Sequence, residues 1–337
     1  MGSGAWRDGF GRVLAAPAVI AGVVLVTLLA TLPLALTLRG ALRDHLGSSL
    51  AANDAADGVN YDWWQEFTSQ ASGIGTTFTP SIIGFATTLD SVSGLLDRRT
   101  LITPIASALG IYVGAWMLLT GGIIDRYARG RRVGAHGFFA ASGTFFFRFL
   151  RLGAGAAAVY WFLFTYVHEW LFTRWYVNMT RDVAVEQTVF YWRLLMYAIF
   201  TALLALTAVV FDYAKVRAVV EDRRSMTGAL IAAMRFIVRH PGRVAGVYAL
   251  NVALWLAIVA IWAIVAPGAG GSGASMWVGF AASQAYIVAR LVVKLQGLAS
   301  ETAVFQRSLA HWGYAAAPAF VPPAPPIVDA RAVSASR

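Results

Sequence analysis

Residues 13–38 read VLAAPAVIAGVVLVTLLATLPLALTL, a run without a single charged side chain. A helix needs about 20 apolar residues to cross the hydrocarbon core of a bilayer, and this run is longer than that. It is also longer than the apolar core of a cleaved signal peptide, which has about 7–15 residues. We therefore expect a membrane anchor that is retained in the protein.

Five further runs have the same character. We place the six spans near residues 14–38, 101–124, 152–172, 188–211, 244–266 and 276–297. The composition agrees, because 58% of the 337 residues are hydrophobic and 13% are charged, against about 45–50% and about 25% in soluble domains. The sequence predicts an all-α polytopic membrane protein with six transmembrane helices. It contains no cysteine, which excludes disulfides, iron–sulfur clusters and thiol catalysis.

Basic residues are distributed unevenly between the connecting segments. With the N-terminus inside, the segments 1–13, 125–151, 212–243 and 290–337 hold 20 of the 27 lysines and arginines. Since an excess of Lys and Arg marks the cytoplasmic side, we expect both termini in the cytoplasm of a bacterial-type inner membrane. The net charge of +10 then indicates contact with the anionic lipid of the bilayer, and not with nucleic acid.

The spans and the segments between them define the expected organisation of the chain. Its parts are an N-terminal anchor (1–38), a small helical extracytoplasmic cap (39–100), a first hairpin (101–175), a second hairpin (188–266), a last span with a cytoplasmic helix (276–311) and a disordered proline-rich tail (312–337). The cap includes an aromatic and acidic segment, residues 61–67, typical of membrane surfaces. The apolar stretch 79–96 is short for a span, and interfacial and re-entrant placements both stay open.

An internal duplication relates the two hairpins. One inward span ends in Asp125-Arg-Tyr-Ala-Arg and another in Asp212-Tyr-Ala-Lys-Val-Arg. An Arg-Phe pair follows each Asp at the same spacing, at Arg148 and at Arg235, before the next span. This pattern predicts two parallel repeats with interfacial elbow helices, at residues 137–150 and 226–240.

The repeated acidic and basic residues form the first set of candidate site residues. An Asp at the C-terminal end of a helix faces the negative end of the helix dipole, so it needs a cation nearby. We expect Asp125 to pair with Arg148 and Asp212 with Arg235, or across the units. The basic residues of the elbows are candidates for a structural role or for binding a lipid headgroup, and they are Arg148, Arg151, Arg235 and Arg239.

A second set of candidates lies within or at the ends of the spans, where ionisable groups are rare. Arg290, Asn251 and Gln284 are expected to line a cavity between the last three spans. The outer ends of the third and fourth spans add His168, Glu169 and Arg193, of which Arg193 is expected to meet a glutamate. We find no metal-ligand spacing and no phosphate-binding loop, and we expect no metal, no cofactor and no catalytic residue.

One stretch resembles a known family. It is Asp212-Tyr-Ala-Lys-Val-Arg-Ala-Val-Val-Glu-Asp222, followed by Ala229-Leu230, Met234-Arg235-Phe236 and Arg239-His240-Pro241. The pattern is similar to that of uncharacterised bacterial six-helix membrane families, including the membrane domain of some glycerophosphodiester phosphodiesterases. We find no hydrolase domain in the chain, so the resemblance implies a membrane scaffold or lipid-proximal module and not phosphodiesterase activity.

Three functions are consistent with these features. We expect a non-catalytic scaffold or subunit of a membrane assembly that contacts anionic lipid, with protein partners binding the 39–100 cap or the proline-rich tail; self-association stays open. The first alternative is a small lipid or solute transporter that uses the groove between the repeats. The second is a membrane-embedded lipid-modifying enzyme, which would need His168 and Glu169 to converge on one cleft.

Overall fold

A computed structural model describes residues 2–47, 49–57, 60–78, 86–130, 134–267 and 273–310. This part of the chain is helical and contains no strand. Six of its helical segments are long and apolar enough to cross a membrane: Pro17–Leu46, Thr103–Arg129, Ala135–Thr180, Glu186–Val220, Pro241–Val265 and Ala274–Leu309. The prediction of an all-α polytopic membrane protein with six spans is confirmed.

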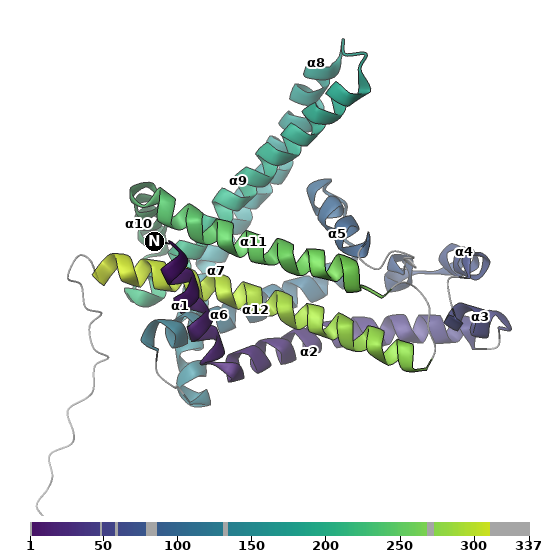
Figure 1. The fold of residues 1–337 in the computed structure, drawn as a ribbon, viewed down its shortest axis with the longest axis horizontal. Coiled ribbons are helices and arrows are strands. Elements are labelled where there is room, and N and C mark those ends of the chain that lie inside the picture. The colour runs from purple at the N-terminus through teal and green to yellow at the C-terminus, as the bar shows by residue number, and fades with distance from the viewer. Residues whose placement is uncertain are drawn as a thin grey trace, which may run out of the picture.

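The expected N-terminal anchor is two helices. Helix α1 (Gly2–Leu14) ends just before Pro17, which opens the first turn of α2 (Pro17–Leu46). Proline lacks a backbone N–H and favours the first turn of a helix, so it separates the two helices. Figure 1 shows α1 turned away from α2 and packed across α12 (Ala274–Ala310). The N-terminal residues are therefore part of the packed protein and do not simply extend the first span.

One end of the bundle contains the main hydrophobic core. The C-terminal halves of α6 (Thr103–Arg129), α9 (Glu186–Val220) and α12 meet there with the first turns of α11 (Pro241–Val265), with α1 and with α10 (Met226–Arg239). We call this the basic end, because it carries most of the arginines. Its most buried large side chains are Ile123, Tyr127, Tyr213, Leu295 and Phe305.

The opposite end of the bundle is open. In Figure 1 the hairpin formed by α9 and the long helix before it diverges from α2, α11 and α12 with distance from the basic end. This hairpin has a small core of its own, made of Leu163, Leu171, Met196 and Phe200. Large apolar side chains such as Trp277 and Phe190 are 66% and 62% exposed. Side chains of this kind on a spanning helix are expected to face lipid.

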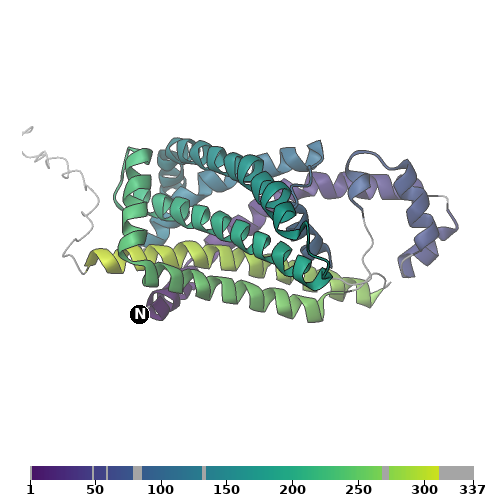
Figure 2. The ribbon, with the colours of Figure 1, turned by 90° about the horizontal axis from the view of Figure 1, so that it is seen from above.

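The two elbows differ. The second is a separate helix, α10, which ends at Arg239 shortly before Pro241 opens α11, and Figure 2 shows it lying across the end of the bundle. The first elbow does not form: residues 137–150 begin one continuous helix, α7 (Ala135–Phe162). No proline interrupts α7, so nothing in its sequence forces a break. The two units also pack differently, because α6 packs along α7 whereas α9 packs against α10 and diverges from α11. The expected equivalence of the elbows is wrong.

The expected cap is helical. Helix α2 continues to Leu46 and is followed by α3 (Ala51–Asp57), α4 (Tyr61–Gln70), a 3₁₀ turn (η1, Gly73–Thr77) and α5 (Ala86–Leu96). Trp63 is buried, and its indole N–H donates to His45 Nδ1 at 3.0 Å. This tryptophan is therefore part of the cap's core and not a surface anchor. The start of the apolar stretch 79–96, residues 79–85, and the proline-rich tail lie outside the described residues.

Candidate functional site

Asp212, a predicted site residue, lies at the centre of a polar cluster at the basic end. Its Oδ1 accepts from Lys215 Nζ, one turn further along α9, at 2.7 Å. Its Oδ2 accepts from the hydroxyl of Tyr248 on α11 at 3.1 Å. The expected partner Arg235 is not involved, because Lys215 lies on the same helix at the spacing where side chains meet. Asp212 thus joins two spans.

Glu301 of α12 completes this cluster and was not predicted. It is 4% exposed, the Tyr248 hydroxyl lies within hydrogen-bonding range, and Asp212 and Lys215 act on it electrostatically. Its Oε2 has no hydrogen-bond partner among the described residues, and neither has the buried hydroxyl of Tyr213. A buried carboxyl group costs free energy unless it is paired or neutral. Glu301 is therefore the most unusual polar group of this end of the molecule.

Helix α1 packs against α11 and α12 at the same end and is fixed there by its own polar contacts. The indole N–H of Trp6 donates to Asn251 Oδ1 on α11 at 3.0 Å, and Asn251 Nδ2 donates to Ser300 Oγ on α12 at 3.0 Å. Gln296 Nε2 donates to the Trp6 carbonyl at 2.7 Å. A side chain at Gly9 would place its Cβ 2.9 Å from the backbone nitrogen of Ser300. The two helices therefore approach closely, which only glycine permits.

The ion pairs expected for the first unit are not formed. Asp125 accepts from Arg129 Nε, one turn further along α6, at 2.7 Å. Arg148 reaches instead to Asp222, in the connection after α9, at 2.6 Å. Several arginines compete for each acid here, and the nearest one on the same helix pairs with Asp125. Arg148 consequently links the first hairpin to the second.

The remaining elbow arginines are free. Arg151, Arg235 and Arg239 are exposed and form no ion pair with the residues that the structure describes. Each lies beside exposed apolar side chains. A guanidinium flanked by apolar groups at the end of a span is suited to the boundary between headgroups and acyl chains.

The predicted cavity residues of the last three spans do not share a site. Asn251 is occupied by its contacts with Trp6 and Ser300. The guanidinium of Arg290 lies 5.5 Å from the ring centroid of Tyr286, one turn earlier on α12. Gln284 forms no hydrogen bond with any described residue. A transport cavity built from these three side chains is therefore not supported.

His168 and Glu169 point to different surroundings. The ring of His168 lies between Phe172 and Phe200, and its Nε2 is 2.9 Å from the carbonyl oxygen of Leu96. Glu169 is exposed and faces outward. Successive residues on a helix diverge, so the two groups do not form an acid–base pair. Arg193 contacts the Tyr197 hydroxyl at 3.4 Å and not a glutamate, and Tyr197 in turn donates to Asp97.

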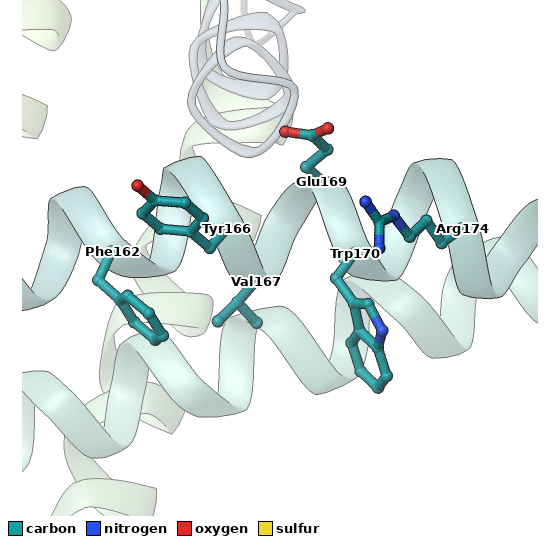
Figure 3. Close-up of a pocket in the computed structure, with 6 residues that line it drawn as sticks. All are labelled: Phe162, Tyr166, Val167, Glu169, Trp170 and Arg174. Carbon is teal, nitrogen blue, oxygen red and sulfur yellow. The ribbon is translucent and has the colours of Figure 1, made fainter.

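Glu169 belongs to a surface pocket at the open end. The pocket has a volume of about 500 Å³, and Figure 3 shows the side chains that line it: Phe162, Tyr166, Val167, Glu169, Trp170 and Arg174. Two π-helical turns, η2 (Leu163–Val167) and η3 (Trp170–Trp175), flank His168 and Glu169. The long helical segment then ends with α8 (Tyr176–Thr180). Such turns occur often at functional sites.

These features define an α-helical multi-pass membrane protein with a polar cluster at its closed end and a mixed aromatic and charged pocket at its open end. No cluster of three or more His, Asp or Glu side chains able to hold a metal ion occurs among the described residues. Comparisons with protein-family models, with curated proteins and with solved structures find no match for this chain.

Proposed function

We propose that this protein is a non-catalytic membrane scaffold whose basic end binds anionic phospholipid in the cytoplasmic leaflet of a bacterial inner membrane. The observation that carries the proposal is the set of unpaired, exposed arginines beside exposed apolar side chains on α10 and on the first half of α7. Both termini are then cytoplasmic. The helical cap on the other side is the surface we propose for protein partners.

Helix α10 has the composition of a helix between protein and lipid. Its inner face, which includes Ala229 and Phe236, is buried against α9 and α12. Its outer face carries Val238, 77% exposed, and Ile231, 48% exposed, next to the free Arg239. A helix that lies across the bundle end with this outer face can insert its apolar groups while its arginines meet phosphate.

The first half of α7 repeats this arrangement without a separate helix. Phe145 and Phe149 are buried, whereas Phe147 is 68% exposed and Leu150 46% exposed. Arg151 follows directly and is free. The same pairing of exposed apolar groups with a free arginine therefore occurs on two helices of the basic end.

The acids of the basic end do not neutralise these arginines. Asp8, Asp125, Glu221 and Asp222 are each paired with another arginine. Arg151, Arg235 and Arg239 thus remain as uncompensated positive charge. A Lys or Arg near an anionic membrane surface contributes about 1 kcal/mol of binding free energy.

The test compares phosphatidylglycerol with phosphatidylcholine as bound lipids of the purified protein, measured by native mass spectrometry. We expect a preference for phosphatidylglycerol in the wild type that falls with added salt. The variant Arg151→Gln/Arg235→Gln/Arg239→Gln should lose it. The matched control is Arg39→Gln/Arg98→Gln/Arg181→Gln, which removes three exposed arginines away from the basic end. The proposal is refuted if both triple variants lose the preference for phosphatidylglycerol equally, or if the variant at the basic end retains it.

A small carrier is the second candidate function, and the buried cluster of Asp212, Lys215, Tyr248 and Glu301 favours it. Ionisable groups buried at the junction of three spans are typical of ion pathways. A carrier that couples transport to protons through Glu301 should move protons into dye-loaded vesicles, and Glu301→Gln should stop this flux. If the protein is a scaffold, neither the wild type nor Glu301→Gln shows proton flux, although the substitution changes the stability of the protein.

A further inference from the structure

The pocket at the open end has a feature that the proposed scaffold function does not use: its residues form a ladder with a chemical gradient. Phe162, Tyr166, Trp170 and Arg174 follow one another at intervals of four along the helix. An α turn holds about 3.6 residues and a π turn holds more, so alternating turns bring residues four apart into line. The two π-helical turns therefore straighten this row.

The ladder faces away from the protein. On the other side of the same helix, Leu163 and Leu171 are only 7% and 1% exposed and pack toward α9. Phe162, Tyr166 and Trp170 are 52%, 53% and 50% exposed. The row is thus directed at whatever surrounds the open end, which for a spanning helix is lipid.

The order of the side chains matches the depth profile of a phospholipid. Phe162 lies nearest the middle of the span, the amphipathic Tyr166 and Trp170 come next, and Arg174 lies toward the outer end. Tyrosine and tryptophan are enriched at the membrane–water interface. In Figure 3 the guanidinium of Arg174 turns back along the helix toward Glu169 and Trp170. Neither Glu169 nor Arg174 forms an ion pair with any residue that the structure describes.

We propose that this pocket binds phosphatidylethanolamine in the leaflet away from the basic end. Arg174 donates to the lipid phosphate, Glu169 accepts from the primary ammonium group, and the acyl chain lies along Phe162. The ammonium group also lies close to the indole of Trp170, which favours cations.

Charge complementarity selects this headgroup. An anionic headgroup would satisfy Arg174 but would be repelled by Glu169. A phosphatidylcholine headgroup carries both charges but has no N–H to donate, so it leaves the carboxylate without a hydrogen bond. The pocket does not include the arginines of the basic end. Lipid binding at the pocket can therefore be confirmed or refuted separately from the proposed scaffold function.

The experiment is a titration of the detergent-purified full chain with phosphatidylethanolamine, phosphatidylcholine and phosphatidylglycerol, each read by native mass spectrometry. We expect Glu169→Gln to weaken binding of phosphatidylethanolamine about tenfold, as loss of a hydrogen bond between charged groups does. Binding of phosphatidylcholine should change little. Arg174→Gln should weaken both, because it removes the phosphate contact.

Two exposed residues of the same end provide the matched controls. Glu186→Gln and Arg181→Gln remove one charge of each sign outside the ladder, and both should bind phosphatidylethanolamine as the wild type does. Unchanged binding in Glu169→Gln overturns the proposal, and so does equal loss in the controls. A dimer that dissociates on size-exclusion chromatography in Glu169→Gln would instead place a second copy of the chain in the pocket.

Discussion

The two ends of the bundle are held together in different ways. At the basic end, helices from the N-terminal α1 to the C-terminal α12 surround one continuous core, and hydrogen bonds between polar side chains join them. At the open end, the hairpin of α7 and α9 has its own small core and diverges from the other spans. Lipid can cover apolar side chains at the open end, but it cannot satisfy buried polar groups.

This difference indicates where stability is located. Substitutions of similar chemistry should cost much at the basic end and little at the open end, even within one helix. Each of the following predictions tests that contrast by a pair of variants in the purified protein.

The largest difference is expected within α12. Phe305 is 1% exposed and packs against Phe236, with ring centroids 5.2 Å apart. Phe305→Ala should lower the free energy of unfolding by about 3–5 kcal/mol. Phe280, at the other end of the same helix, is 57% exposed, and Phe280→Ala should change it by less than about 0.5 kcal/mol. Chemical denaturation in detergent measures both, and similar losses would contradict the contrast.

Two glycines of α6 should give effects of opposite sign. A Cβ on Gly122 would lie 2.4 Å from Ser142 Oγ of α7, whereas a Cβ on Gly114 would meet nothing within 4 Å. Gly122→Ala should therefore destabilise the protein by about 1–3 kcal/mol through overpacking. Gly114→Ala should stabilise it by about 0.5–1 kcal/mol, because alanine favours the helix. Thermal unfolding of both variants checks the signs, and a stabilised Gly122→Ala would refute the close packing of α6 and α7.

One hydrogen bond of α1 should contribute measurably to its attachment. Trp6→Phe keeps most of the ring but leaves Asn251 Oδ1 without its donor, which should cost about 1–3 kcal/mol. Amides of α1 should then exchange hydrogen faster than in the wild type. Trp277→Phe, an exposed tryptophan at the open end, should leave the exchange of α1 unchanged. If Trp6→Phe also leaves it unchanged, α1 is not held by this contact.

The smallest effect concerns acid pH at the open end. The hydrogen bond from Tyr197 is the main cause that lowers the pKa of Asp97 in the folded protein, aided by its hydrogen bond with Ser93 and by nearby arginines. Folding therefore favours the charged form. The charged Asp97 therefore stabilises the folded protein. This stabilisation is fully present above the ordinary aspartate pKa of about 3.9, and it is lost as the pH falls through the lowered pKa of Asp97 in the folded protein.

Tyr197→Phe should remove much of this pH dependence. The measurement is hydrogen exchange in α5 between about pH 5 and pH 3, where the wild type should become less protected as the pH falls. Tyr191→Phe is the control, because Tyr191 lies on the same helix and contacts only Gln187 among hydrogen-bonding side chains described. An identical pH profile in wild type and Tyr197→Phe would show that Asp97 does not hold α5.

The sequence predicts the spans well because a span is a local property. An apolar run without charge, such as residues 13–38, requires a helix in lipid whatever its neighbours are. Pro241 predicts the break between α10 and α11 in the same local way. The absence of a corresponding proline in α7 already argued against two equivalent elbows, although the matching Asp and Arg spacing favoured them.

The polar contacts could not be predicted because they depend on packing. Asp125 had several arginines in reach, and sequence spacing alone does not decide which one pairs with it. Glu301 lies in the segment 290–337, which the charge distribution places in the cytoplasm, and its burial depends on the packing of α12 against α9 and α11. The glycines of residues 2–14 lower helix propensity, so α1 gave little local indication of its role. An acid in an otherwise small and apolar helical stretch, Ala299 to Phe305, was the one available sign.

The packing of α1 on α12 is the most direct point to test, because it joins the N-terminal helix to the last span at the basic end. The chain has no native cysteine, so Ser300→Cys introduces a single thiol at a position that is 0% exposed and lies against Gly9 of α1. In native membranes a water-soluble maleimide should label this thiol far more slowly than it labels Gly11→Cys, an exposed position of α1 with open space around it. Equal labelling of the two variants would contradict the closed basic end.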